Sequence, residues 1–282
     1  MKSVYIVDAV RTPIGRYGGA LSSIRPDDLL AYIIKALLKR NESVDVNAIE
    51  DVIAGAANQA GEDNRNVARM AALLAGLPVT IPGNTVNRLC ASGLQAIMDG
   101  TRQIMCGDAE MIIACGVESM TRAPFVIGKS ETPFDRSSEM FDTTMGWRFI
   151  NNNLSAMHYP FGMGETAENV AKKWNIGRQE QDEFAFASQQ KYAAAKAANK
   201  WDDEIAAVEI NKKGLISWVV DDEHPRAVSY THLRAHETVL DLVCRLLLEK
   251  KTNKLMHLSY VATIHLNKDT KEHNEKMCIH VK

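Results

Sequence analysis

The sequence has no glycine after Gly214 and no proline after Pro225, although its 282 residues include 17 glycines and 8 prolines. A stretch of 56 residues without either lacks the turn signals that a folded domain of that length needs. Six of the 8 histidines fall after Arg226, and the net charge changes from −5 over residues 1–226 to +3 over residues 227–282. Composition therefore excludes one uniform domain and divides the chain near residue 226.

The first 226 residues lack several other features. No apolar run is long enough to span a membrane, and a strand pattern at Val4–Val10 leaves no room for a targeting segment. The three cysteines, Cys90, Cys106 and Cys115, are too few and too scattered for a disulfide framework. The negative charge and the lack of a basic stripe argue against nucleic-acid binding. We therefore expect a cytoplasmic protein that binds neither membranes nor nucleic acid.

Strand and helix patterns alternate over residues 1–119. The expected strands are Val4–Val10, Glu50–Ala56, Thr85–Arg88 and Glu110–Gly116, and the expected helices are Pro26–Arg40, Asn66–Ala75 and Ala91–Met105. This alternation predicts an α/β fold in which helices cover a buried sheet. Residues 120–226 are richer in turns and polar residues, with the strongest helical patterns at Glu165–Trp174 and Arg178–Asn199. The chain is thus expected to have three segments, 1–119, 120–226 and 227–282.

The segment Asn87–Gly93, Asn-Arg-Leu-Cys-Ala-Ser-Gly, places Cys90 where an extended run turns into a helix. A cysteine at that point meets unpaired backbone N–H groups and the positive end of the helix dipole. Both stabilise thiolate over thiol, and the thiolate is the nucleophile. From these residues alone, Cys90 is either a nucleophile or a small buried apolar residue, the commoner state of a lone cysteine.

Several segments resemble the thiolases, enzymes that make or cleave 3-oxoacyl thioesters of coenzyme A. In order along the chain they are Asp8–Gly15, Asn87–Gly93, Gly116–Met120 and Gly164–Val170. Two further segments, Ala57–Met70 and Asp142–Asn151, are most similar to the 3-oxoadipyl-CoA thiolase branch of that family, which implies the beta-ketoadipate pathway. The resemblance runs from about Met1 to Arg226.

The resemblance implies a thiolase-like layered α-β-α domain, incomplete here, over residues 1–119, with an inserted α+β loop domain, truncated, over residues 120–226. It implies an acyltransferase in which Cys90 takes up the acyl group. Met163 matches the position that lines the pantetheine channel, and Arg226 matches the arginine that packs against the adenine end of coenzyme A. The substrates are coenzyme A thioesters, with no further cofactor and no metal. Family members are homo-oligomers, either dimers or tetramers.

Three parts of the family's catalytic set do not occur in this sequence. They are a base histidine in a Gly-His-Pro segment, an acid/base cysteine in a Gly-rich segment, and an Asn-Glu-Ala-Phe segment that builds an oxyanion pocket. The sequence therefore predicts an N-terminal fragment of a 3-oxoacyl-CoA thiolase, inactive as this chain. The alternatives are a non-catalytic fragment with at most weak binding of CoA esters, and a fragment of a related decarboxylating 3-oxoacyl synthase, which shares the helix-end cysteine.

The tail Ala227–Lys282 has a different origin in this interpretation. Val228–Thr238 and Asp241–Leu248 back-translate to the two constant parts of a common transposon-derived sequencing adapter, separated by the length of a sample index. We therefore interpret the tail as translated non-biological DNA and expect it to make no core contact. Two patterns in it are then accidents of codon content: the metal-ligand spacing of His232 and His236, and the basic amphipathic run Leu240–Lys251.

Overall fold

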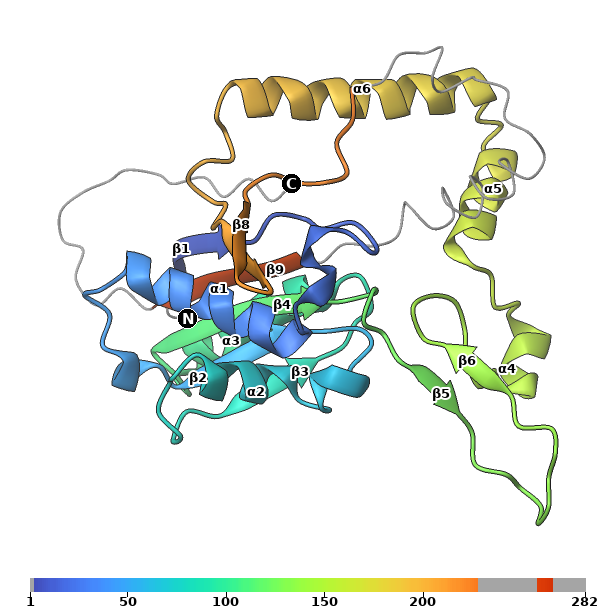
Figure 1. The fold of residues 1–282 in the computed structure, drawn as a ribbon, viewed down its shortest axis with the longest axis horizontal. Helices are drawn as coiled ribbons and strands as arrows, with labels where there is room; N and C mark the ends of the chain where they lie inside the picture. Colours follow the sequence, from blue (N-terminus) through green and yellow to red (C-terminus); the bar gives the residue numbers. More distant parts are fainter. Residues whose placement is uncertain (1–2, 228–257, 266–282) are drawn as a thin grey trace.

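The computed structural model describes residues 3–227 and 258–265 (Figure 1). The histidine pair His232/His236 and the run Leu240–Lys251 lie outside the described residues. So do both adapter-like segments of the tail.

A five-stranded sheet forms the centre of the first domain, with the strand order β1-β9-β4-β2-β3. Its strands are β1 (Tyr5–Arg11), β2 (Asp51–Gly55), β3 (Gly83–Val86), β4 (Met111–Glu118) and β9 (Leu258–His265). Strand β2 pairs parallel with β3 and β4, whereas β9 runs antiparallel to β1 and β4. The four strands expected in residues 1–119 are confirmed, with bounds that differ by one or two residues.

Helices cover both faces of this sheet, and alternation along the strands decides which residues meet them. Helices α1 (Pro26–Arg40) and α2 (Val67–Leu74) bury their apolar residues with Val52 and Ala54 of β2. Helix α3 (Ser92–Cys106) packs on the opposite face, where Ile53 of β2 meets Ala96 and Ile104. The sheet and its two helical layers confirm the expected α-β-α fold (Figure 1).

Strand β9 contradicts the expectation that the tail makes no core contact. It lies between β1 and β4, and among the named strands it is the only one that pairs with β1. The pairing requires only a segment of sufficient length and strand propensity, because the hydrogen bonds join backbone groups. Leu258–His265 contains three β-branched residues, Val261, Thr263 and Ile264, and it lies between β1 and β4, whose facing edges would otherwise be unpaired. A tail without a selected sequence can therefore still complete the ladder.

Residues 120–227 form hairpins and helices beside this domain (Figure 1). They comprise the hairpin β5 (Phe125–Ile127) and β6 (Met140–Asp142), helices α4 (Asn152–Met157), α5 (Met163–Lys173) and α6 (Arg178–Ala197), and the hairpin β7 (Val208–Lys212) and β8 (Leu215–Val219). Three short 3-10 turns, η1 (Ala20–Ser23), η2 (Val46–Ala48) and η3 (Gly61–Asp63), lie in the first domain. Among the described residues, helix α5 buries none of its own residues and α6 buries only Asp182, so neither helix presents a fully buried apolar face.

Candidate active site

Cys90 lies in a tight turn between β3 and α3. The residue before it, Leu89, has a φ of +50°, in the left-handed region that non-glycine residues seldom adopt. Local polar groups stabilise this conformation: Leu89 N donates to Asn87 Oδ1 at 2.9 Å, and Ser92 Oγ donates to Leu89 O at 2.6 Å. Ser92 Oγ also accepts from Arg88 N at 2.9 Å. The Asn and Ser of the sequence motif therefore shape the turn that presents the cysteine.

A glycine in β2 allows the start of α3 to approach the sheet. A Cβ added to Gly55 would lie 2.3 Å from the carbonyl carbon of Ser92 and 2.5 Å from Gly93 N. Both neighbours are backbone atoms, so no side-chain movement can relieve the overlap. Gly55 thus fixes the distance between the end of β2 and the helix that follows Cys90.

The Cys90 side chain is exposed and stands immediately before the N-cap residue of α3, Ala91. Ala91 provides no side-chain acceptor to the amides of the first turn. The thiol is therefore accessible to a substrate and lies at the positive end of a helix that its N-cap side chain leaves uncapped. The structure places Cys90 at the helix start that the sequence predicts, and it is not a buried apolar residue.

The other two described cysteines lie in different surroundings. Cys115 is buried in β4, where its Sγ contacts Ile53 O at 3.4 Å and burial raises the pKa of the thiol. Cys106 is exposed at the last residue of α3, next to the C-terminal carbonyls. Cys90 differs from both because it alone combines exposure with a helix N-terminus.

Met163 and Arg226 lie on segments outside the sheet. Met163 is the first residue of α5 and is 71% exposed, and Gly162 is its N-cap. Arg226 is exposed beyond β8, and its backbone N donates to Gln189 Oε1 of α6 at 2.9 Å. No hydrogen bond joins any two of Cys90, Met163 and Arg226 in the described residues. Their roles on the coenzyme remain predictions from the resemblance.

Two carboxyl groups that the sequence did not reveal, Glu118 and Asp63, are largely buried and interact electrostatically. Glu118, at the end of β4, accepts from Ala57 N through Oε2 at 2.8 Å. Burial raises the pKa of Glu118, although the N–H groups of Ala57 and Asn58 and the charge of Arg148 oppose that shift. Burial, with the nearby charges of Glu118, Asp27 and Glu62, raises the pKa of Asp63 to about 7. In the sequence, Glu118 is part of the motif Gly116–Met120, but the motif assigns that residue no role.

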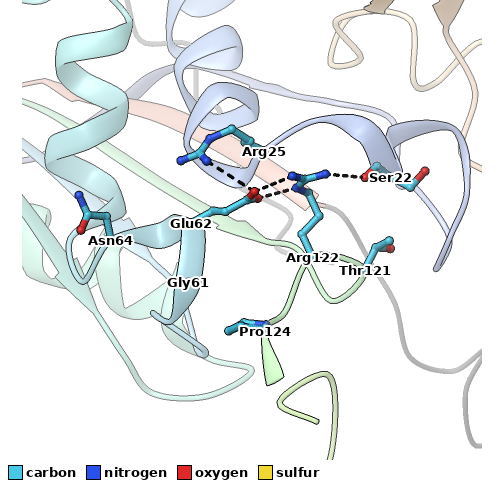
Figure 2. A pocket seen from close by; sticks show the side chains of 8 residues that line it. All are labelled: Ser22, Arg25, Gly61, Glu62, Asn64, Thr121, Arg122 and Pro124. Atoms are coloured by element: carbon cyan, nitrogen blue, oxygen red, sulfur yellow. Dashed lines mark hydrogen bonds and ion pairs between the residues drawn. The ribbon is translucent and has the colours of Figure 1, made fainter. Parts of the chain in front are cut away.

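A hollow of about 640 Å³ lies between η1, η3 and the segment after β4 (Figure 2). Figure 2 shows the Glu62 carboxylate between the guanidinium groups of Arg25 and Arg122. Arg122 donates through two nitrogens to the Glu62 carboxylate and through Nη1 to Ser22 O at 3.3 Å, and Arg25 Nη1 lies 3.5 Å from Glu62 Oε1. Arg25 also pairs with Asp27 at 2.7 Å. Because acidic partners already neutralise both guanidinium groups, the hollow is a structural junction and not an open anion site.

Neither a metal-ligand cluster nor a membrane-spanning helix occurs among the described residues. Their side chains form no cluster of three or more His, Cys, Asp or Glu that could hold a metal ion. None of their helices is both long enough and apolar enough to cross a membrane.

Comparisons with known proteins agree with this geometry. Residues 4–242 match the family model described as thiolase, N-terminal domain, which continues past Arg226. The chain is 57% identical over 228 residues to the beta-ketoadipyl-CoA thiolase of Acinetobacter baylyi, covering 80% of this chain and 57% of that protein. It is 54% identical over 227 residues, with the same two coverages, to the 3-oxoadipyl-CoA/3-oxo-5,6-dehydrosuberyl-CoA thiolase of Escherichia coli.

Among solved structures, the acetyl-CoA acetyltransferase of Bacillus anthracis matches with a TM-score of 0.80 and 30% identity, over 95% of this chain and 66% of that one. The chain thus spans less than two thirds of the length of the relatives that it matches. The alignments with the two curated relatives cover 228 and 227 residues, which is close to the length of the resemblance expected from Met1 to Arg226. With its cysteine at the turn into α3, its layered sheet and these matches, the chain belongs to the thiolase family.

Proposed function

We propose that this chain is the nucleophile-bearing N-terminal part of a 3-oxoacyl-CoA thiolase. The observation that carries the proposal is the exposed Cys90 at the N-terminus of α3, in a chain of the thiolase family. In the reaction, the Cys90 sulfur attacks the 3-oxo carbonyl carbon of a 3-oxoacyl-CoA and forms a C–S bond. The bond between C2 and C3 then breaks, and its electron pair leaves on C2, which takes a proton to give acetyl-CoA. A second coenzyme A thiolate then removes the acyl group from Cys90.

The substrate that we propose is 3-oxoadipyl-CoA. Its support is the similarity to relatives whose names state that substrate, and to the thiolase branch that Ala57–Met70 and Asp142–Asn151 resemble. Cleavage of a 3-oxoadipyl chain between C2 and C3 leaves a four-carbon succinyl group on Cys90. We place Met163 on the pantetheine channel and Arg226 at the adenine end, in a cytoplasmic assembly of two or four copies.

The printed chain itself is proposed to be inactive in turnover. Its sequence holds no Gly-His-Pro base and no second acid/base cysteine in a Gly-rich segment. General acid–base catalysis contributes ~10²–10⁴-fold, and each missing oxyanion donor ~10²–10³-fold. We propose that the native reading frame departs from this sequence after Arg226 and encodes those groups.

Resequencing the locus and assaying both proteins tests this proposal. The protein from the native frame is expected to cleave 3-oxoadipyl-CoA faster than acetoacetyl-CoA. The printed chain is expected to show no thiolysis above its Cys90→Ser variant. A chromosomal gene that encodes the histidine-rich tail, or turnover by the printed chain, would contradict the proposal.

A further inference from the structure

Glu118 has no part in the chemistry described above, yet its carboxylate lies at the start of a chain of hydrogen bonds that ends beside Cys90. Glu118 Oε2 accepts from Ala57 N at 2.8 Å. The carbonyl of the same residue, Ala57 O, accepts from Asn87 Nδ2 at 2.8 Å. Asn87 Oδ1 in turn accepts from Leu89 N at 2.9 Å. Three hydrogen bonds therefore connect the end of β4 to the amide of the residue that precedes Cys90.

This connection attaches the side chain of Asn87, at the start of the nucleophile turn, to the ends of β2 and β4, beside the backbone hydrogen bond from Ala56 N to Val86 O at 3.1 Å. The other bonds of the turn are local, because Ser92 Oγ joins Arg88 N and Leu89 O within the same five residues. Leu89 holds a positive φ, which costs free energy and persists only where surrounding contacts fix it. Asn87 and its partner Ala57 are thus placed to maintain the orientation of Leu89, and Glu118 is placed to hold Ala57.

A second set of bonds joins the next residue, Asn58, to the loop region through its side chain. Asn58 Nδ2 donates to Thr143 Oγ1 at 3.2 Å, and Asn58 Oδ1 accepts from Arg148 Nη2 at 3.1 Å. The charge of Arg148 also acts on Glu118. The charged groups around Glu118 are therefore Arg148 from the loop region and Asp63 from η3. Glu118 lies where the first domain, the nucleophile turn and the loop region meet.

We propose that Glu118 is a positioning residue, which orients the Leu89–Cys90 turn through the backbone N–H and carbonyl of Ala57 and the side chain of Asn87. This inference rests on the proposed role of Cys90 as nucleophile. If Glu118 is removed, the Ala57 amide loses its acceptor, Asn87 loses a fixed partner, and Leu89 relaxes from its left-handed conformation. Cys90 then leaves the position that the turn gives it immediately before the N-cap of α3, and its thiol is no longer held in one orientation.

The test measures the alkylation rate of Cys90 by iodoacetamide at pH 7 in the full chain, with peptide mass spectrometry to separate the cysteines. Cys106 in the same molecule is the internal reference, because it is exposed and far along the same helix. Glu118→Ala is expected to lower the Cys90/Cys106 rate ratio by about fivefold or more, the value of one lost hydrogen bond. Glu118→Gln is expected to restore the ratio to within about twofold of wild type, because its amide oxygen still accepts from Ala57 N.

Two further variants separate positioning from general stability. Asn87→Ser is expected to lower the ratio as Glu118→Ala does, and the double variant to lower it no further, because both residues act through one chain of bonds. Glu62→Ala is the matched control: this half-buried glutamate pairs with Arg25 and Arg122 but has no bond to the turn. It is expected to reduce stability without changing the ratio.

An unchanged ratio in Asn87→Ser, or additive losses in the double variant, overturns the inference. So does a loss in Glu62→Ala equal to that in Glu118→Ala. If Glu118→Ala does not fold, Asn87→Ser and Glu118→Gln still decide the question. Alkylation requires no acyl-CoA, so these outcomes are independent of whether Cys90 is acylated by a thioester.

Discussion

Arg11 and Asp222, 211 positions apart in the sequence, form a buried two-bond pair: Nη1 lies 2.8 Å from Oδ1 and Nη2 lies 3.1 Å from Oδ2. Only 8% of the Arg11 side chain and 3% of the Asp222 side chain are exposed. Asp222 also accepts from Ile14 N at 2.7 Å and from Tyr192 Oη at 3.0 Å. This pair attaches α6 and the segment leading to Arg226 to the end of β1.

Breaking the pair is expected to destabilise the chain strongly. Asp222→Asn leaves the Arg11 guanidinium buried with Glu204 as its remaining acidic partner, which is expected to cost about 3 kcal/mol in the free energy of unfolding. Asp221→Asn is the control, since the Asp221–Lys196 pair is 60% and 50% exposed and is expected to contribute less than about 1 kcal/mol. Chemical denaturation of both variants checks the difference, and equal losses would contradict it.

The same pair predicts a dependence of stability on pH. Burial opposes ionisation of Asp222, but the Arg11, Ile14 and Tyr192 hydrogen bonds and the Arg11 charge lower its pKa below the ordinary 3.8. The stabilisation is therefore complete above about pH 4 and is lost as the pH falls through the lower value in the folded state. Denaturation curves of the wild type and of Asp222→Asn are expected to converge below pH 4. If the difference in stability between the two proteins stayed constant with pH, the Arg11–Asp222 pair would not be the cause of the pH dependence.

Asp63 is expected to have the opposite dependence. Burial and the charges of Glu118, Asp27 and Glu62 raise its pKa from 3.8 to about 7, so the folded chain holds a proton that the unfolded chain has released. Stability should fall as the pH rises from about 4 to 7 and then level off. Asp63→Asn removes this loss and is expected to be more stable than wild type at pH 8 by at least about 1 kcal/mol, the equivalent of one pKa unit. Thermal scans at pH 4 and pH 8 check this prediction, because a stability difference between Asp63→Asn and wild type that is equal at both pH values would contradict it.

Gly55→Ala is expected to disturb the nucleophile turn. The new methyl group would overlap the Ser92 and Gly93 backbone at 2.3 and 2.5 Å, so α3 must move away from β2. We expect a loss of about 1–3 kcal/mol, the range of overpacking changes. Gly93→Ala is the control, because a Cβ there meets nothing within 4 Å, and it is expected to be neutral or stabilising. Urea denaturation of the two variants gives the comparison.

Strand β9 predicts that the tail affects the first domain. Ala262 pairs with Ala9 of β1 and Ala114 of β4, so Ala262→Pro removes a ladder N–H at the centre of the strand. Amide hydrogen exchange of Tyr5–Arg11 is expected to accelerate, since β1 loses its partner strand. Unchanged exchange in β1 would show that the ladder does not depend on this tail.

Helical spacing and turn residues were sufficient to predict much of the fold. The helix expected at Pro26–Arg40 has those bounds, because Pro26 occupies its first turn and its apolar residues share one face. Sequence could not reveal the pairing of Arg11 with Asp222, since the motif Asp8–Gly15 marks a family without naming a partner 211 positions away. It also gave Glu118 no role, because Glu118 reaches Asn87 through a backbone peptide whose residue type, Ala57, carries no signal. The expectation that the tail makes no core contact was wrong, because composition reports turn signals, whereas a strand that pairs with existing strand edges needs none.

Trapping an acyl group tests the central claim, that Cys90 is the acylated nucleophile, most directly. The protein from the native reading frame is incubated with acetyl-CoA, quenched in acid and digested, and the cysteine peptides are examined by mass spectrometry before and after hydroxylamine. The account predicts a hydroxylamine-labile acetyl group on the Cys90 peptide, at a level that saturates with acetyl-CoA, and none at Cys106 above background. Acetylation of Cys106 to the same level, or no acetyl group on Cys90, would contradict it.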